Sequence, residues 1–167
     1  MLNKLLTLVL VREPSRVLLG LKKKGFGEGK WNGFGGKVEP GETILEGAKR
    51  ELLEESGVVS NSLEEIGLLK FEFVGDPQIL EVHVFTSNTF EGEIKESDGS
   101  TRIFLHFAEM RPQWFYTDKI PLHQMWADDK YWFPMFLKGS KFKGYFLFEG
   151  HEKIVKYQLD EVEKLNS

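Results

Sequence analysis

The sequence of 167 residues contains no cysteine. This excludes disulfide bonds and thiolate metal sites, and it is typical of proteins from a reducing compartment. It also has no hydrophobic run long enough to span a membrane. A short apolar run near the N-terminus, LLTLVLV, lies between Lys4 and Arg12 and is not followed by a small-residue cleavage signal. We therefore expect a strand there rather than a signal peptide, and no membrane partner.

An excess of basic residues is also lacking. The chain has 22 Lys and Arg against 26 Asp and Glu, which gives a net charge of −4. A long nucleic acid would not be held by such a charge, so no stable nucleic-acid partner is expected. A small polyphosphate would be repelled unless a cation mediates, which is a first indication of a metal. The four histidines, His83, His106, His123 and His151, show no metal-ligand spacing, and each is predicted to be structural or exposed.

Length and composition fit one domain over residues 1–167, with 41% hydrophobic and 29% charged residues. Two apolar runs around the turn residues Glu13-Pro14-Ser15 predict a hairpin over residues 5–22. The clearest helix is predicted over residues 43–56, with a Thr43–Glu46 capping box and Gly57 as its end.

The rest of the chain alternates between the two kinds of element. Strand-like patterns cover residues 65–75 and 80–88, and two more strands are expected around Gly150. A second helical region is predicted over residues 118–138, interrupted by Pro121 and Pro134. Mixed strands with a few helices predict an α+β fold with αβα layers.

The predicted first helix carries a group of carboxylates. At about 100° per residue, Glu51, Glu54 and Glu55 share one face, while Ile44, Ala48 and Leu52 lie on another. Carboxylate oxygens are hard ligands that suit Mg²⁺ or Mn²⁺. The alternative is a solvated acidic face with an ion pair between Arg50 and Glu54.

A glycine-rich loop, residues 33–37, directly precedes this helix. Glycine lets backbone approach a ligand closely, although such a loop by itself is equally typical of a turn or a β-bulge. The combination of loop and acidic helix favours a metal site.

The spacing of these residues resembles the Nudix box. Gly36, Glu42, Arg50-Glu51-Leu52, Glu54-Glu55 and Gly57-Val58 occupy every specified position of that motif. The resemblance to the Nudix hydrolase superfamily implies an αβα sandwich with a mixed sheet, in which the box forms loop–helix–loop. It also implies catalysis with Mg²⁺, for which Mn²⁺ can substitute, held by Glu51, Glu54, Glu55 and the backbone carbonyl of Gly35 or Gly36. Arg50 would orient the glutamates, and Glu42 would have a structural role.

Outside the box, stretches such as RVLLGLKKKGFGEGKWNGFGGKV, EMRPQWF and MWADDKYWFP are similar to animal Nudix enzymes that hydrolyse oxidised purine nucleoside triphosphates. The resemblance implies 8-oxo-dGTP and 2-hydroxy-dATP as substrates, a monomer, and a location in the cytoplasm with mitochondrial and nuclear pools. It implies a further metal-site residue, Glu109. The substrate-binding residues it implies are Thr7, Lys22, Asn32, Phe34, Gly35, Gly36, Lys37, Phe71, Phe73, Met110, Trp126, Asp128 and Asp129.

Several of these residues have a second interpretation. Phe71 and Phe73 lie two apart on a strand, so core packing alone explains them, and Phe34 is also expected in the core together with Trp31, Phe142 and Phe146. Asp128 or Asp129 is equally expected to cap the following helix. If both enter the pocket, one apparent pKa should rise, so that a protonated and an ionised carboxyl read two different base edges.

One segment departs from the subfamily pattern. Residues 99–108, GSTRIFLHFA, have no counterpart between the ESD and EMRP motifs. The insert either forms a loop or shifts the register of the strand that leads to Glu109 and Met110. We expect a loop, because both flanking motifs are retained.

Two rival functions remain open from the sequence. One is a Nudix hydrolase that acts on ADP-ribose, dinucleoside polyphosphates or capped RNA. The other is a nucleotide-binding module that the insert has deprived of catalysis.

Overall fold

The computed structural model describes residues 3–94 and 110–166. The chain begins with a hairpin of β1 (Asn3–Glu13) and β2 (Arg16–Lys22), which pair antiparallel from Val11–Leu18 to Glu13–Arg16. The turn contains Pro14, which cannot donate a ladder hydrogen bond. The predicted hairpin is confirmed.

Within the described residues, two further antiparallel pairs and two separate strands complete the sheet. β4 (Glu64–Phe73) pairs antiparallel with β5 (Ile79–Ser87), and β7 (Lys141–Glu149) pairs antiparallel with β8 (Lys153–Val162). Parallel pairing of β1 with β5 and of β4 with β7 joins them in the order β3-β2-β1-β5-β4-β7-β8. β3 is Trp31–Asn32, and β6 (Met110–Tyr116) pairs with β2. The sheet is therefore mixed, as predicted.

β6 was not predicted from the sequence pattern. Pro112 lies in its middle, opposite Gly20 of β2. Proline and glycine both weaken a strand signal, and proline is tolerated where a strand has no partner on its N–H side. This strand therefore forms because it pairs with β2, which lies far away in the sequence.

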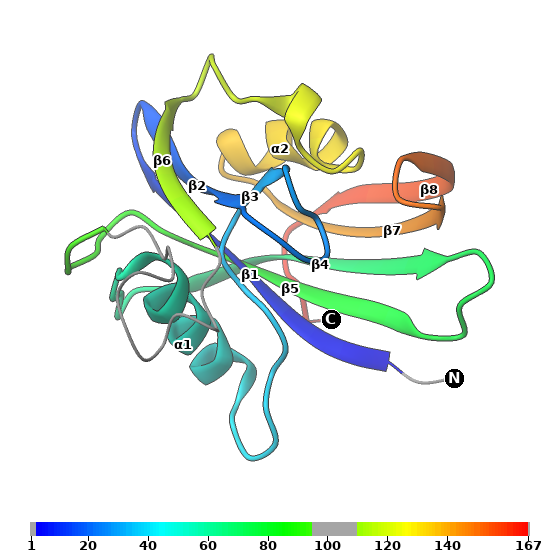
Figure 1. Cartoon of the computed structure of the whole chain (residues 1–167), viewed down its shortest axis with the longest axis horizontal. Helices are drawn as coiled ribbons and strands as arrows, with labels where there is room; N and C mark the ends of the chain where they lie inside the picture. Colours follow the sequence, from blue (N-terminus) through cyan, green and yellow to red (C-terminus); the bar gives the residue numbers. More distant parts are fainter. Residues whose placement is uncertain (1–2, 95–109, 167) are drawn as a thin grey trace.

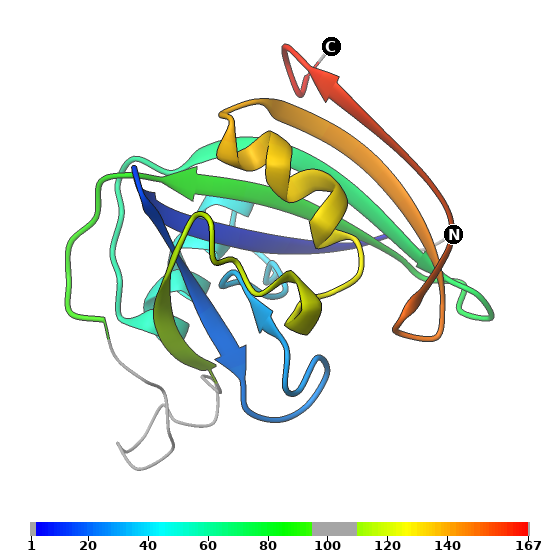
Figure 2. The ribbon, with the colours of Figure 1, turned by 90° about the horizontal axis from the view of Figure 1, so that it is seen from above.

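The two faces of the sheet are covered by different helices (Figure 1). On β1, Leu10 belongs to the core cluster that contains Trp132 and Phe136 of α2 (Asp129–Leu137). Its neighbour Val9 belongs to the cluster that contains Leu52 of α1 (Ile44–Ser56). Alternate residues of a strand face opposite sides of a sheet. Figure 2 shows α2 lying across the strands, on the face of the sheet that it covers. This confirms the predicted αβα layers.

Helix α1 begins and ends where the sequence predicts. The Thr43 hydroxyl accepts from the Glu46 backbone N–H at 3.0 Å, and the Glu46 carboxylate accepts from the Thr43 N–H at 2.7 Å. Gly57 follows the helix in the left-handed conformation, with a φ of 80°. Ala48 and Leu52 are fully buried. Local capping and tertiary packing therefore agree over this segment.

The second helical region differs from the prediction. Within residues 118–138 only the short 3-10 turn η2 (Leu122–Gln124) and α2 are helical. Pro134 lies inside α2 instead of interrupting it. Proline removes one hydrogen bond, to the carbonyl of Lys130, and both residues are exposed, so water can satisfy that carbonyl. No helix within the described ranges is long and apolar enough to cross a membrane.

The capping box gives a test of this local structure. Thr43→Ala removes the hydroxyl that satisfies the N–H of Glu46, and we expect a loss of about 1 kcal/mol in the free energy of unfolding. Thr43→Ser keeps the hydroxyl and serves as the control, with a loss of under about 0.5 kcal/mol. Urea unfolding measures both. Equal stability of the alanine and serine variants would show that the cap contributes nothing.

Candidate functional site

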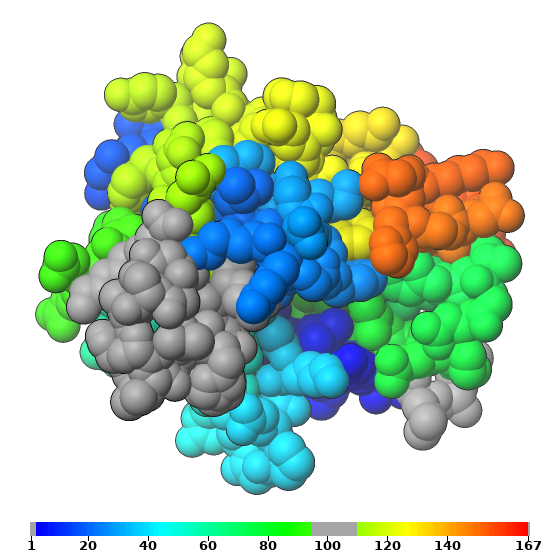
Figure 3. Space-filling model, viewed as in Figure 1, coloured from blue at the N-terminus to red at the C-terminus, as the bar shows by residue number. Residues whose placement is uncertain are grey.

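A cavity of about 900 Å³ opens between the β2–β3 loop, β1, β4 and the start of α2. Figure 3 shows the surface hollowed between this loop, drawn in blue, and the β4–β5 hairpin, drawn in green. A cavity of this size is large enough for a nucleotide-sized ligand. Aromatic rings and lysines both line it, so it combines apolar walls with positive charge.

The predicted substrate-binding residues are brought together by this cavity, with one exception. Those that line it are Thr7, Lys22, Asn32, Gly35, Gly36, Lys37, Phe71, Phe73, Met110, Trp126, Asp128 and Asp129. The exception is Phe34, whose side chain is fully buried in the core on the α1 side of the sheet. Its neighbours in the loop reach the cavity because successive residues of an extended chain point to opposite sides. The expected role of Phe34 in binding is therefore wrong for its side chain, and its alternative place in the core is confirmed.

The glycine loop brings backbone against two elements at once. A Cβ atom on Gly35 would lie 1.8 Å from the carbonyl oxygen of Thr7, and one on Gly36 would lie 2.7 Å from Oε1 of Glu51. Neither position has room for a side chain. The N–H of Gly35 donates to Oε1 of Glu55 at 2.9 Å. The loop is therefore held between β1 and the acidic face of α1.

Arg50 connects the carboxylates of this site. It donates to both oxygens of Glu42, at 3.0 and 2.7 Å, and through Nη1 to Glu51 at 2.9 Å and Glu54 at 3.0 Å. Its Nη2 also donates to the carbonyl of Lys37 at 3.0 Å. A planar guanidinium with five N–H groups suits such a shared role. The geometry agrees with the orienting role predicted for Arg50 and the structural role predicted for Glu42.

The acidic face is not a solvated surface. The side chains of Glu51 and Glu54 are 17% and 26% exposed, and Glu55 is 5% exposed. Burial raises the pKa of Glu51, against the opposing effect of Arg50. Burial and the charge of Glu51 raise the pKa of Glu55 to about 8, against the opposing effects of the Gly35 N–H and Lys22. The alternative of a solvated acidic face is therefore wrong, although its Arg50–Glu54 ion pair is present.

These carboxylates fit a hard divalent cation. Desolvated carboxylates of like charge are costly to ionise, and a cation beside them removes that cost. Within residues 3–94 and 110–166, no three acidic or histidine side chains converge on one point. Arg50 holds Glu51 and Glu54, while the N–H of Gly35 holds Glu55, so each of the three carboxylates is bound by a protein donor. The chemistry of the donor set, oxygen only, suits Mg²⁺ and Mn²⁺.

Asp128 and Asp129 both face the cavity at the start of α2. Asp128 is 4% exposed and accepts from Nε1 of Trp132 at 2.8 Å. Asp129 is 3% exposed, and its Oδ2 is buried without a hydrogen-bond partner among the described residues. The side chain of Asp128 makes no capping hydrogen bond to α2, so the capping interpretation is wrong for it. An unpartnered buried oxygen that lines a cavity is available to a ligand.

The two neighbouring carboxyls are costly to ionise in this setting. Burial raises the pKa of both. The pKa of Asp129 lies well above its ordinary value, first through burial and then through the charge of Asp128. A protonated carboxyl donates a hydrogen bond and an ionised one only accepts, so the raised pKa values bear on which role each side chain can take.

Aromatic rings form the cavity wall opposite β1. Phe71 stacks on Phe146 at 5.7 Å between ring centroids, and Phe73 stacks on Phe148 at 5.6 Å. Phe71 and Phe73 are half-buried and line the cavity together with the buried Phe148, while the buried Phe146 is not part of the lining. The core and binding interpretations of Phe71 and Phe73 are therefore compatible. Trp31, Phe142 and Phe146 are buried, as predicted.

Some cavity residues were missed from the sequence. Phe26 and Lys30 come from the β2–β3 loop, and His151 comes from the turn after β7. Phe26 stands between glycines, which was an available signal. His151 was predicted to be structural or exposed; it is exposed and also lines the cavity, because pairing of β4 with β7 carries its turn there. Glu109, His106 and the insert at residues 99–108 lie outside the described residues.

Comparison with known proteins gives consistent matches. The NUDIX domain family model matches residues 3–136. The chain is 58% identical over 163 residues to the oxidized purine nucleoside triphosphate hydrolase of Danio rerio, covering 98% of each chain. It is 52% identical over 161 residues to the protein of the same name from Mus musculus, covering 96% of this chain and 97% of that one.

The fold is shared with solved structures. The MutT protein of Bacillus halodurans superposes with a TM-score of 0.78 and 28% identity, over 94% of this chain and 97% of that one. The MutT protein of Methanosarcina mazei has a TM-score of 0.63 and 25% identity, over 82% of this chain and 94% of that one. The sheet and helices described above therefore form an established arrangement.

The shared contacts of Arg50 predict a defect in metal binding. Arg50→Lys replaces a fork of donors by a single ammonium, which cannot hold Glu42, Glu51 and Glu54 together. We expect the affinity for Mn²⁺ to fall about 10- to 100-fold, measured by calorimetry. Arg16→Lys, the same change in the β1–β2 hairpin, is the control. Wild-type affinity in Arg50→Lys would show that the glutamates do not depend on Arg50.

The buried pair predicts a pH dependence of stability. Because the pKa of Asp129 is raised in the folded state, the folded protein keeps a proton that the unfolded chain releases above the ordinary pKa of 3.8. The contribution of Asp129 to the free energy of unfolding is fully present below that value. It is lost as the pH rises toward the pKa of Asp129 in the folded state. Asp129→Asn mimics the protonated form, so its stability relative to wild type should increase from about pH 5 to about pH 8 in urea unfolding. Asp118→Asn, at an exposed position, is the control. A constant difference between Asp129→Asn and wild type across this range would contradict the raised pKa.

Proposed function

Because the chain belongs to the NUDIX domain family, we propose that it hydrolyses oxidised purine nucleoside triphosphates to the monophosphate and pyrophosphate. Its relatives from Danio rerio and Mus musculus carry the name of that activity and align over nearly their whole length. The observation that carries the proposal is one cavity lined both by the acidic helix, through Glu55, and by the buried pair of Asp128 and Asp129. The first suits a polyphosphate with its cation, and the second suits a polar base edge.

We propose Mg²⁺ as the cofactor, with Mn²⁺ as a substitute. Glu51, Glu54 and Glu55 would hold it, together with Glu109 from outside the described residues. The carbonyl of Gly36 already accepts from the N–H of Thr7 at 2.9 Å, which favours the carbonyl of Gly35 as the backbone ligand. When bound, the cation neutralises the polyphosphate and acidifies a water molecule.

The chain's own residues then orient the substrate and move a proton. Lys22 and Lys37 line the cavity and attract the phosphates. One carboxylate of α1 accepts the proton of the attacking water, and water adds across the bond between the α and β phosphates. Arg50 keeps that helix face oriented through its bonds to Glu51 and Glu54.

The base would be read at the other end of the cavity. Trp126 offers a wide apolar face to a purine, and Asn32 carries both a donor and an acceptor. We propose that a proton shared by Asp128 and Asp129 adapts their donor and acceptor pattern to 8-oxo-guanine or to 2-hydroxyadenine. The unpartnered Oδ2 of Asp129 supports this role.

We further propose that residues 1–167 act as one domain and as a monomer. A cytoplasmic location would follow from a substrate that belongs to the free nucleotide pool.

Turnover of a nucleotide panel tests the proposal. We expect pyrophosphate release from 8-oxo-dGTP and 2-hydroxy-dATP to exceed that from dGTP, ADP-ribose and dinucleoside polyphosphates. Glu55→Gln should lower kcat by about 10²- to 10⁴-fold. Glu46→Gln, on the same helix, keeps its capping box and is the control. Faster turnover of ADP-ribose or a dinucleoside polyphosphate would replace the proposed substrate, and tight binding without pyrophosphate release would indicate a binding module.

The same assay includes two variants of the base end and one deletion. Asp128→Asn and Asp129→Asn should change the ratio of kcat/KM for the two oxidised substrates by about tenfold or more. If neither variant affects either substrate, the pair does not read the base. A chain without residues 99–108 should keep its preference for 8-oxo-dGTP if the insert is a loop.

A further inference from the structure

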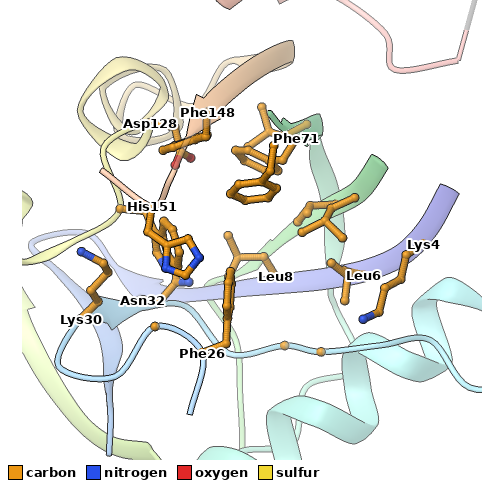
Figure 4. A pocket seen from close by; sticks show the side chains of 18 of the residues that line it. Lys4, Leu6, Leu8, Phe26, Lys30, Asn32, Phe71, Asp128, Phe148 and His151 are labelled. Carbon is orange, nitrogen blue, oxygen red and sulfur yellow. The ribbon is translucent and has the colours of Figure 1, made fainter. Parts of the chain in front are cut away.

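Two loops that are far apart in the sequence meet at the mouth of the cavity. The first is the β2–β3 loop, residues 23–30, and the second is the turn of residues 150–152 between β7 and β8. Phe26 of the first loop stacks on Trp126 at 5.0 Å between centroids, and His151 of the second meets the edge of Phe26 at 5.0 Å. His151 also lies 5.6 Å from Trp126. Figure 4 shows Phe26 and His151 next to each other in the pocket.

An ion pair ties the same two loops. Nζ of Lys30 lies 2.8 Å from Oε1 of Glu152, across a separation of 122 residues. Nζ of Lys30 also lies 5.4 Å from the centre of the Trp126 ring. The side chain of Lys30 is only 19% exposed, so the pair is partly shielded on one side. The ion pair and the ring contacts therefore act on the same three segments of chain.

The mouth exposes one large aromatic side chain. Phe26 is 60% exposed although it lines the cavity and stacks on Trp126. A phenylalanine gains free energy when it leaves water, and a flat ligand in the cavity would cover this ring. The exposed ring, the shielded lysine and the histidine edge all point to contact with a bound base.

We infer that His151 and Glu152 form a clamp with Phe26 and Lys30 that closes on the base of the nucleotide and determines how tightly it is held. The inference rests on the proposed function, since it concerns the base end of the same cavity. His151 is a specificity-determining residue that acts through its ring, which packs on Phe26 and Trp126. Glu152 and Lys30 are positioning residues that hold the two loops together.

One of the two loops of the clamp lies outside the range that the family model matches. The NUDIX family model matches residues 3–136, and the turn of residues 150–152 lies beyond that range. Parallel pairing of β4 with β7, from Gly67–Phe142 to Phe73–Phe148, brings this turn to the cavity. Base selectivity can therefore depend on residues that the shared motif does not contain.

The ion pair is tested by binding of the product, 8-oxo-dGMP, without divalent metal, so that the base end is measured apart from hydrolysis. Glu152→Gln and Lys30→Gln should each raise the Kd in calorimetry by about two- to fivefold. The double variant should be no worse than Lys30→Gln alone, because both changes remove one interaction. Glu149→Gln is the matched control, since its ion pair with Lys153 stays within the hairpin. kcat for 8-oxo-dGTP should stay at its wild-type value while KM rises.

Variants of His151 separate the ring from its polar atoms. His151→Ala should raise the Kd about 3- to 10-fold, and His151→Phe should restore most of it because the ring contacts return. His151→Asn keeps hydrogen-bonding atoms without the ring and should resemble the alanine variant. His123→Ala, on the exposed η2 turn, should bind as the wild type does.

Two outcomes overturn the clamp while leaving the proposed function intact. One is a wild-type enzyme that hydrolyses 8-oxo-dGTP while all variants of residues 30, 151 and 152 keep the wild-type Kd. The other is a wild-type Kd in His151→Asn and a raised Kd in His151→Phe.

If the wild type neither binds nor hydrolyses oxidised purines, the proposed function fails. Amide hydrogen exchange then tests the clamp without a ligand. Glu152→Gln should speed amide exchange at residues 25–29 relative to Glu149→Gln, and equal exchange would reject the clamp.

Discussion

The organisation of the acidic site depends on the guanidinium of Arg50. Without the positive charge of Arg50, repulsion would act between the carboxylates of Glu42, Glu51 and Glu54. These lie on a half-buried surface, where charge repulsion is poorly screened. Arg50 binds all three and also the carbonyl of Lys37, so it joins helix α1 to the glycine loop. Glu55 lies outside this network and is held by the N–H of Gly35 instead. Glu55 is therefore a buried carboxyl beside three glutamates whose charge Arg50 already neutralises in part.

The two ends of the cavity carry different ionisable groups. Lys4, Lys22 and Lys37 line the cavity, and Figure 4 places Lys4 at the end opposite Asp128. At the Asp128 end, burial and the charge of Asp128 raise the pKa of Asp129, so that two negative charges there are disfavoured. A ligand with a flat polar base at one end and several negative charges at the other matches both ends. This match, more than the size of the cavity, supports a nucleoside triphosphate as the substrate.

The sheet explains how these ends come to lie in one cavity. β1 pairs parallel with β5 and β4 pairs parallel with β7, so strands from the start, middle and end of the chain lie side by side. Thr7, Phe71 and the turn after β7 reach the cavity from three different strands. The rigid sheet holds the walls, whereas the loops of residues 23–30 and 150–152 form the mouth. Binding residues on loops that a rigid scaffold positions are a common arrangement in enzymes.

The sequence by itself determined helix α1, its capping, its carboxylate face and the family, because motif spacing, helical period and caps are properties of neighbouring residues. It also predicted part of the cavity lining, through resemblance to relatives that share the fold. Only the tertiary structure decided that Phe34 enters the core, that Pro134 lies within a helix, that β6 forms despite Pro112, and that His151 reaches the cavity. Each of these depends on contacts between segments far apart in the chain, which outweigh the local preference of the residue. The raised pKa values of Glu55 and Asp129 have the same origin, since the loss of water that causes them exists only after folding.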